Sequence, residues 1–293
     1  MRGTFRKIGK MAHRGILFAI SALAVFCFSV NCFAQEEAKA GVGVNKIVSL
    51  GPSITEELYL LGVQDKLFGV TTYCQKPLPA AEKDKVGSTV EVNVEKIVSI
   101  RPDLVLATSM VNPKSLEKLK ELGIKVVVFG AAEDFGHMRA QFLELADYLG
   151  ERGKAEKILD EVGKRVEKVK DSVKGLPRPR VIVQAGARPL WVASGDSFIN
   201  DIIEMSGGEN IGPEGKNGIF SRERVLELDP DVIIITTMGM VGEEEEFLWR
   251  KYPSISAVRN NRIYIVDSYK FCSPTPVSFA EALEEMAFIL HKK

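Results

Sequence analysis

A sixteen-residue segment occurs twice in this chain, 128 positions apart. Residues 95–110 read EKIVSIRPDLVLATSM, and residues 223–238 read ERVLELDPDVIIITTM. The copies share Glu, Pro, Asp, Thr and Met at matching places, and most other positions exchange similar residues. Each copy has a short amphipathic stretch, then Pro-Asp, then an apolar run of strand length. The repeat therefore predicts two lobes with the same internal structure.

Length and composition agree with two globular lobes. A chain of 293 residues suits two domains of about 100–150 residues each, and the repeat favours two over one. Hydrophobic residues make up 45% of the chain and charged residues 27%, which is enough apolar material for packed cores. The 39 basic residues are balanced by 39 acidic ones. This balance argues against nucleic-acid binding, which requires a basic face.

The first 34 residues differ in kind from the rest. They contain five basic residues and no acidic one, then an apolar run at 15–30, then Cys32-Phe33-Ala34. This pattern predicts a signal peptide at 1–34 and an exported protein of the periplasm. The alternative is a membrane anchor outside the cytoplasm, but the run is short for a span of about 20 apolar residues. Without these residues the net charge is about −5, since 34 basic and 39 acidic residues remain.

Short apolar runs alternate with helical patterns along the rest of the chain. The expected strands are 46–50, 67–70, 104–107, 125–129, 180–184, 190–193, 232–235 and 262–266. The expected helices are 53–61, 93–100, 113–122, 135–149, 197–205, 221–228, 243–251 and 277–290. This alternation predicts an α/β fold in which two Rossmann-like lobes each contain a parallel sheet.

One longer helical pattern separates the two lobes. Residues 151–174 carry an apolar side chain at every third or fourth position, and Pro177 follows shortly after. We therefore expect an N-terminal lobe at 44–150, a linking helix at 151–175 and a C-terminal lobe at 178–293. A helix of this length spans about 36 Å and should join the lobes rigidly.

Several motifs resemble the helical-backbone periplasmic substrate-binding proteins of ABC importers, the Fe/cobalamin periplasmic-binding family. The motifs are IVSLGPSITEELYLLG at 47–62, GVTTYCQKP at 69–77, the two repeat copies, SGGENI at 206–211 and RNNRIYIVD at 259–267. The resemblance covers essentially all of the chain after residue 34. It implies a monomeric protein that is not an enzyme and has no intrinsic cofactor. Such a protein captures a corrinoid, haem or ferric siderophore between its lobes and delivers it to a permease dimer.

The first residue of each repeat copy is a glutamate, Glu95 or Glu223. From the residues alone, Asn93 and Ser221 are good N-caps, so both glutamates fall in a first helical turn and complement the helix dipole. In the resembled family, the matching Glu of each lobe pairs with Arg residues of the permease. The resemblance therefore implies that Glu95 and Glu223 dock the protein on its transporter.

Open parallel sheets bind ligands at the carboxyl ends of their strands, so the ligand should lie between the lobes. Aromatic side chains in these loops suit a macrocycle, and methionines supply adaptable contacts, although core packing is the alternative for each aromatic. Tyr73 matches a ligand-contacting Tyr of the cobalamin-binding branch. The predicted ligand contacts are Tyr73, Cys74, Ser88, Thr89, Met110, Trp191, Phe220, Met238, Met240, Phe271 and Cys272.

Two of the four cysteines lie in the predicted signal peptide, which leaves Cys74 and Cys272. In an exported protein such a pair commonly forms a disulfide. A bridge across the cleft would block it, however, and it would need Cα atoms within about 7 Å. The two thiols could instead ligate the metal of a bound complex, or simply pack. The sequence leaves these three interpretations open.

The sequence leaves the ligand open among corrinoid, haem and ferric siderophore. In the cobalamin branch a Trp stands at the position of Thr89 and an Arg near Ser273. These differences argue against cobalamin itself as the ligand but not against a shorter corrinoid. A non-transport enzyme or sensor with a cleft cysteine pair is the alternative function, although no G-x-S-x-G motif is present. The acidic run 243–246 is interpreted as a solvated partner of a helix dipole.

Overall fold

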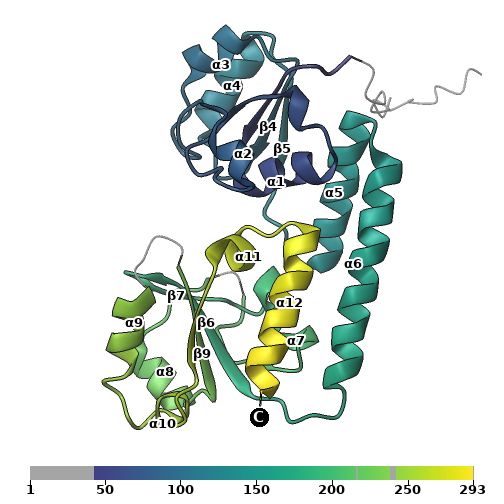
Figure 1. The fold of residues 1–293 in the computed structure, drawn as a ribbon. Coiled ribbons are helices and arrows are strands. Elements are labelled where there is room, and N and C mark those ends of the chain that lie inside the picture. Colours follow the sequence, from purple (N-terminus) through teal and green to yellow (C-terminus); the bar gives the residue numbers. More distant parts are fainter. Residues whose placement is uncertain (1–42, 216, 238–241, 293) are drawn as a thin grey trace, which may run out of the picture. The chain divides into compact units, whose positions relative to one another are not determined.

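We describe residues 43–215, 217–237 and 242–292 of a computed structural model of the protein. Within these ranges the strands form two sheets of five strands each. Helices pack on both faces of each sheet, as the four hydrophobic clusters record (Figure 1). The predicted α/β fold class is confirmed. No helix in the described part of the chain is both long and apolar enough to cross a membrane.

The first sheet has the strand order β3-β2-β1-β4-β5, and every pair in it is parallel. Its central strand β1 is buried at every position, as expected for a parallel sheet covered on both faces. Its strands are β1 (Ile47–Leu50), β2 (Leu67–Val70), β3 (Asp84–Lys85), β4 (Leu104–Thr108) and β5 (Val126–Phe129).

The second sheet has the order β10-β9-β6-β7, with β8 also paired to β6. It differs from the predicted parallel sheet in one strand, because β7 runs antiparallel to β6. Only Arg188 and Pro189 join these two strands, and two residues can close a hairpin but not a parallel crossover. Its strands are β6 (Arg180–Ala187), β7 (Leu190–Val192), β8 (Glu209–Asn210), β9 (Val232–Thr236) and β10 (Ile263–Val266).

The helices with clear apolar periodicity lie where the sequence predicts them. They are α1 (Pro52–Leu60), α3 (Val94–Ile100), α4 (Pro113–Glu121), α5 (Phe135–Leu149), α6 (Arg152–Val173), α7 (Phe198–Met205), α8 (Arg222–Leu228), α9 (Gly242–Trp249) and α12 (Pro276–His291). Six short elements were not predicted, because helices and strands of two to five residues display little periodicity. These are β3, β8, η1 (Gln64–Lys66), α2 (Leu78–Ala81), α10 (Ser256–Arg259) and α11 (Ser268–Cys272).

The long helix α6 contributes to both cores. Ala155 and Leu159 belong to the cluster on one face of the first sheet, whereas Val162, Val166 and Val169 belong to the cluster on the second. Helices α5 and α12 pack alongside it (Figure 1). Because one continuous helix is buried in both cores, bending it would expose apolar surface in at least one of them.

The two repeat copies adopt the same local structure. Asn93 accepts from the Lys96 amide and Ser221 from the Arg224 amide, so both predicted N-caps are present. Both helices, α3 and α8, end at a residue with left-handed backbone, Arg101 at φ 53° and Asp229 at φ 43°. The Pro that follows each of them cannot continue a helix. The repeated sequence therefore specifies where each helix ends, and a capping residue two positions before each copy specifies where it begins.

The repeated aspartate holds the first strand of each lobe. Asp103 Oδ2 accepts from the amides of Asn45 and Lys46 at 2.8 and 2.9 Å, and Asp231 Oδ2 accepts from the Arg180 amide at 2.9 Å. The two backbone hydrogen bonds lower the pKa of Asp103. The repeat thus includes a carboxylate that fixes the neighbouring strand, a role that the sequence analysis missed because the partner residues are distant in sequence.

Candidate functional site

Two exposed side chains follow strands of the first sheet at their carboxyl ends. Tyr73 comes after β2 and is 58% exposed, and Met110 comes after β4 and is 68% exposed. Large apolar side chains this exposed at a sheet edge are candidate ligand contacts. Of the other predicted contacts in this lobe, Thr89 is buried, and Ser88 bonds within its own turn by accepting from the Glu91 amide at 2.9 Å.

In the second lobe, Trp191 lies in β7 and is half-buried. Its backbone pairs with Ile219, which is 57% exposed. Gly218 lies directly against the indole, since a Cβ on this glycine would approach Trp191 Cε2 to 2.4 Å. Phe220 packs partly against the second core. The predicted contacts Met238 and Met240 lie outside the described residues.

Three exposed apolar residues near these loops were missed by the sequence analysis. Leu78 is 81% exposed, Ile219 57% and Val90 55%. Each lies within five residues of a predicted contact, so the loops themselves were correctly identified. Which side chain in each loop faces solvent could not be predicted, because irregular backbone has no fixed period.

Phe271 is not at the surface. It is fully buried in the core of the second lobe, together with Val232 and Val266. No helix was predicted between the strand at 262–266 and the helix at 277–290, but residues 268–272 form helix α11, whose N-cap Asp267 accepts from the Tyr269 amide. One face of that helix turns toward the core and takes Phe271 with it. The interpretation of Phe271 as a wall of the ligand site is therefore abandoned.

The two cysteines of the described chain are both free. Cys74 is fully buried and its Sγ lies 3.1 Å from Thr55 Oγ1 and 3.2 Å from Thr71 Oγ1. Cys272 is partly buried, and burial raises the pKa of its thiol. Within residues 43–215, 217–237 and 242–292, no group of three or more His, Cys, Asp or Glu side chains could hold a metal ion. The buried position of Cys74 favours packing over ligation of a bound metal complex.

Glu95 and Glu223 occupy the same place in their two helices. Each lies in the first turn, of α3 and α8 respectively, and each is exposed. Hydrogen bonds from its own backbone and from Ser221 lower the pKa of Glu223. Each lobe therefore presents one exposed carboxylate at a structurally equivalent position.

The acidic run at the start of α9 is only partly solvated, which corrects the sequence-based interpretation. Glu245 is 4% exposed, and its Oε2 lies 2.5 Å from Arg222 Nη2 and 2.8 Å from Gln184 Nε2. Gln184 Oε1 in turn accepts from Trp249 Nε1 at 2.7 Å, and the Arg222 guanidinium lies 4.4 Å from the Trp249 ring centroid. This buried network joins α8, the helix of Glu223, to β6 and α9.

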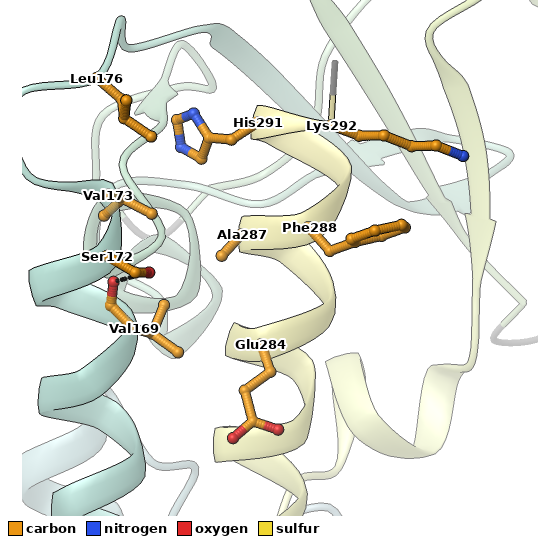
Figure 2. Close-up of a pocket in the computed structure, with 9 residues that line it drawn as sticks. All are labelled: Val169, Ser172, Val173, Leu176, Glu284, Ala287, Phe288, His291 and Lys292. Carbon is orange, nitrogen blue, oxygen red and sulfur yellow. Dashed lines mark hydrogen bonds between the residues drawn. The ribbon is translucent and has the colours of Figure 1, made fainter.

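An open groove of about 490 Å³ lies between α6 and α12 (Figure 2). Its lining residues are Val169, Ser172, Val173, Leu176, Glu284, Ala287, Phe288, His291 and Lys292. None of the predicted ligand contacts lines it. His291 Nε2 lies 2.9 Å from the Ser206 carbonyl oxygen. The groove is therefore a separate surface feature and not the predicted ligand site.

Glu56, on α1, is a carboxyl group with an unusual environment. Its Oε1 is buried without a hydrogen-bond partner among the described residues. Its pKa is raised from the ordinary 4.5 to about 7, chiefly by burial; Lys76 lowers it, and nearby Asp267 and Glu281 raise it. Because the folded state holds this proton more tightly than the unfolded state, the contribution to stability is full below about pH 4.5 and is lost as the pH rises through 7.

We therefore expect Glu56→Gln, which imitates the neutral acid, to reduce the pH dependence of the free energy of unfolding between about pH 5 and pH 8, while Glu57, whose pKa burial raises to about 8, retains part of it. At about pH 8 the variant should be more stable than the natural chain by about 2–3 kcal/mol. Urea unfolding at a series of pH values measures both. Glu117→Gln, at an exposed position of α4, is the control and should leave the profile unchanged. If the free energy of unfolding of Glu56→Gln depends on pH as steeply as that of the natural chain, Glu56 does not titrate in this range.

The chain matches the family model described as periplasmic binding protein over residues 47–270. The ABC transporter substrate-binding lipoprotein YvrC of Bacillus subtilis, itself uncharacterized, is 30% identical over 277 residues, which cover 90% of this chain and 85% of the relative. A vitamin B12-binding protein of Yersinia pseudotuberculosis is 30% identical over 249 residues, 83% of this chain and 87% of the relative.

A solved structure has the same fold. The periplasmic heme-binding protein RhuT from Roseiflexus sp. RS-1, in its apo form, matches with a TM-score of 0.75. The match covers 85% of this chain and 98% of RhuT, at 22% sequence identity. A sequence identity of 22% supports a shared fold and nothing about the ligand of this chain.

Proposed function

Because the chain belongs to the periplasmic binding protein family, we propose that it is the substrate-binding component of an ABC importer. It captures a metal chelate between its two lobes outside the cytoplasm and delivers this chelate to a permease dimer. It acts as a monomer, carries no cofactor of its own and releases the ligand unchanged.

The observation that carries the proposal is the pair of exposed glutamates at equivalent positions in α3 and α8. Packing inside a single lobe does not require this equivalence, because both side chains face solvent. A permease dimer has two related faces, and a binding protein with two related lobes can present one anchor to each. Glu95 and Glu223 are therefore proposed to pair with basic residues of the permease.

For the ligand, we propose a corrinoid first. Relatives named vitamin B12-binding protein reach 30% identity over most of this chain. Tyr73, Met110, Trp191 and Ile219 offer exposed or half-exposed apolar surface to the faces of a macrocycle. Thr89 is buried and takes the place of the Trp of the cobalamin branch, which favours a corrinoid shorter than cobalamin.

Haem and ferric siderophores are the competing ligands. Haem commonly takes Tyr or His as an axial ligand. Tyr73 is exposed and could serve, whereas the Tyr269 hydroxyl already donates to the Tyr73 carbonyl oxygen. Siderophore chelates are anionic and favour clusters of Arg. Arg222 is paired with Glu245 and is therefore not free to bind an anionic siderophore. The exposed apolar side chains suit a corrin ring better than a siderophore.

The test is a visible absorption titration of the purified protein with cobinamide, cobalamin, hemin and a ferric siderophore. We expect the corrin bands of cobinamide to shift with saturation at one equivalent. A shifted Soret band with hemin alone would replace the corrinoid by haem. If the spectrum of none of the four chelates changes, the metal-chelate assignment is refuted. If a bound chelate is chemically altered, the protein is not a pure binding protein.

A further inference from the structure

Two segments nearly 200 residues apart in sequence meet at the main chain of Tyr73. The Tyr269 hydroxyl donates to the Tyr73 carbonyl oxygen at 2.5 Å. Lys76 Nζ lies 2.5 Å from Asp267 Oδ2 and 4.7 Å from the centroid of the Tyr269 ring. These contacts join the loop after β2, in the first lobe, to the corner between β10 and α11, in the second.

On the side of the second lobe, these groups are held by the core. Tyr269 and Phe271 lie two positions apart on α11 and so point in nearly opposite directions. Phe271 is fully buried, which fixes the helix and leaves Tyr269 directed away from the core. Asp267 uses both oxygens: Oδ1 accepts from the Tyr269 amide, and Oδ2 pairs with Lys76. Burial opposes the ionisation of Asp267, but Lys76 and the amide outweigh it and lower its pKa.

On the side of the first lobe, the loop is held by Cys74. This side chain is fully buried beside Thr55 and Thr71, and its amide donates to the Thr71 carbonyl oxygen at 3.1 Å. Tyr73, the preceding residue, is exposed. The carbonyl oxygen of Tyr73 therefore accepts from the second lobe while its ring stays free on the first. A movement of the second lobe relative to this loop would therefore act directly on Tyr73, the residue predicted to contact the ligand.

We propose that Lys76, Asp267 and Tyr269 form an interlobe clamp that positions Tyr73 and retains the bound ligand. The inference deepens the proposed function and rests on it for the ligand. These three are positioning residues, since Tyr269 holds the Tyr73 carbonyl oxygen and the pair of Lys76 and Asp267 holds the same loop three residues further on. The ion pair is partly exposed, at 44% and 40%, and such a pair alone contributes little. The clamp works because three contacts act on one short loop.

The first measurement needs no ligand. Amide hydrogen exchange of residues 71–76 should become faster in Lys76→Met and in Tyr269→Phe, and Lys76→Arg should restore protection because it keeps the charge over the ring. Glu284→Gln is the matched control. It removes a comparably exposed ion pair, between Arg165 and Glu284 at 2.8 Å, that joins α6 to α12. Unchanged exchange in both clamp variants would overturn the clamp.

The second measurement is the dissociation rate of the chelate that binds in the titration, followed by its absorption change. We expect dissociation about tenfold faster in Lys76→Met and Tyr269→Phe, and unchanged in Glu284→Gln. Faster exchange with an unchanged dissociation rate would overturn the role in ligand retention. If no chelate binds the natural chain, the metal-chelate assignment fails, and hydrogen exchange still decides whether the clamp exists.

Discussion

Charge reversal of both glutamates, Glu95→Lys with Glu223→Lys, is expected to abolish uptake while the affinity for the ligand stays within about twofold. Both side chains are exposed, so core packing and the ligand loops do not depend on them, and reversal removes only their favourable interaction with the helix dipole. Each introduced lysine would face the basic permease residue that the natural carboxylate is proposed to bind. Removing one partner of such a pair costs about 2–5 kcal/mol, so two reversals should weaken docking far more than about a hundredfold.

Uptake of labelled ligand into cells that depend on this protein measures the first quantity, and the absorption titration measures the second. The matched control is Glu117→Lys with Glu244→Lys, which reverses one exposed charge in each lobe away from the repeated position. The control should transport normally. Loss of ligand binding in the Glu95 and Glu223 variant would refute the docking assignment, and so would normal uptake.

The second large effect is expected on stability. Arg222→Met should lower the free energy of unfolding by about 3 kcal/mol, because it leaves the buried carboxylate of Glu245 without its cation. Glu245 is 4% exposed and also accepts from Gln184, which cannot neutralise it. The Arg222 guanidinium additionally covers the Trp249 ring at 4.4 Å, and this contact would be lost. Urea unfolding measures the difference.

The same helix supplies the control. Arg224 pairs with Glu227 at 2.9 Å, but their side chains are 55% and 65% exposed. Arg224→Met should therefore cost less than about 1 kcal/mol. The double variant Arg222→Met with Glu245→Leu, which removes both charges, should recover much of the loss. Equal costs for Arg222→Met and Arg224→Met would contradict the buried network, and no recovery in the double variant would contradict its electrostatic origin.

The long and periodic elements could be predicted from the sequence, because a helix or buried strand of sufficient length displays its period locally. The 22-residue helix α6 and the strands β1, β4 and β9 were predicted to within about a residue at most ends. The antiparallel direction of β7 could not be predicted from its composition, which fits either direction. It follows from a two-residue connection and from the pairing with β6.

For the candidate site, the sequence located the loops but not the direction of each side chain. Tyr73 and Met110 are exposed as predicted contacts should be, whereas Cys74 is fully buried between exposed neighbours and Phe271 is fully buried between partly exposed ones. Adjacent residues in a loop can face opposite sides, and only the surrounding core selects which side is buried. The same limitation hid Ile219 from the sequence analysis.

The sixteen-residue repeat by itself determined the left-handed ends of α3 and α8 and the strands that follow, and the N-caps come from Asn93 and Ser221, two positions before each copy. These features depend on residues close in sequence, so the local pattern specifies them. The tertiary structure alone decided what the repeated Asp103 holds, why Glu245 is buried, and that Tyr269 reaches the Tyr73 carbonyl oxygen. The partners in these contacts lie tens to hundreds of residues apart, and only the packing of the cores brings them together.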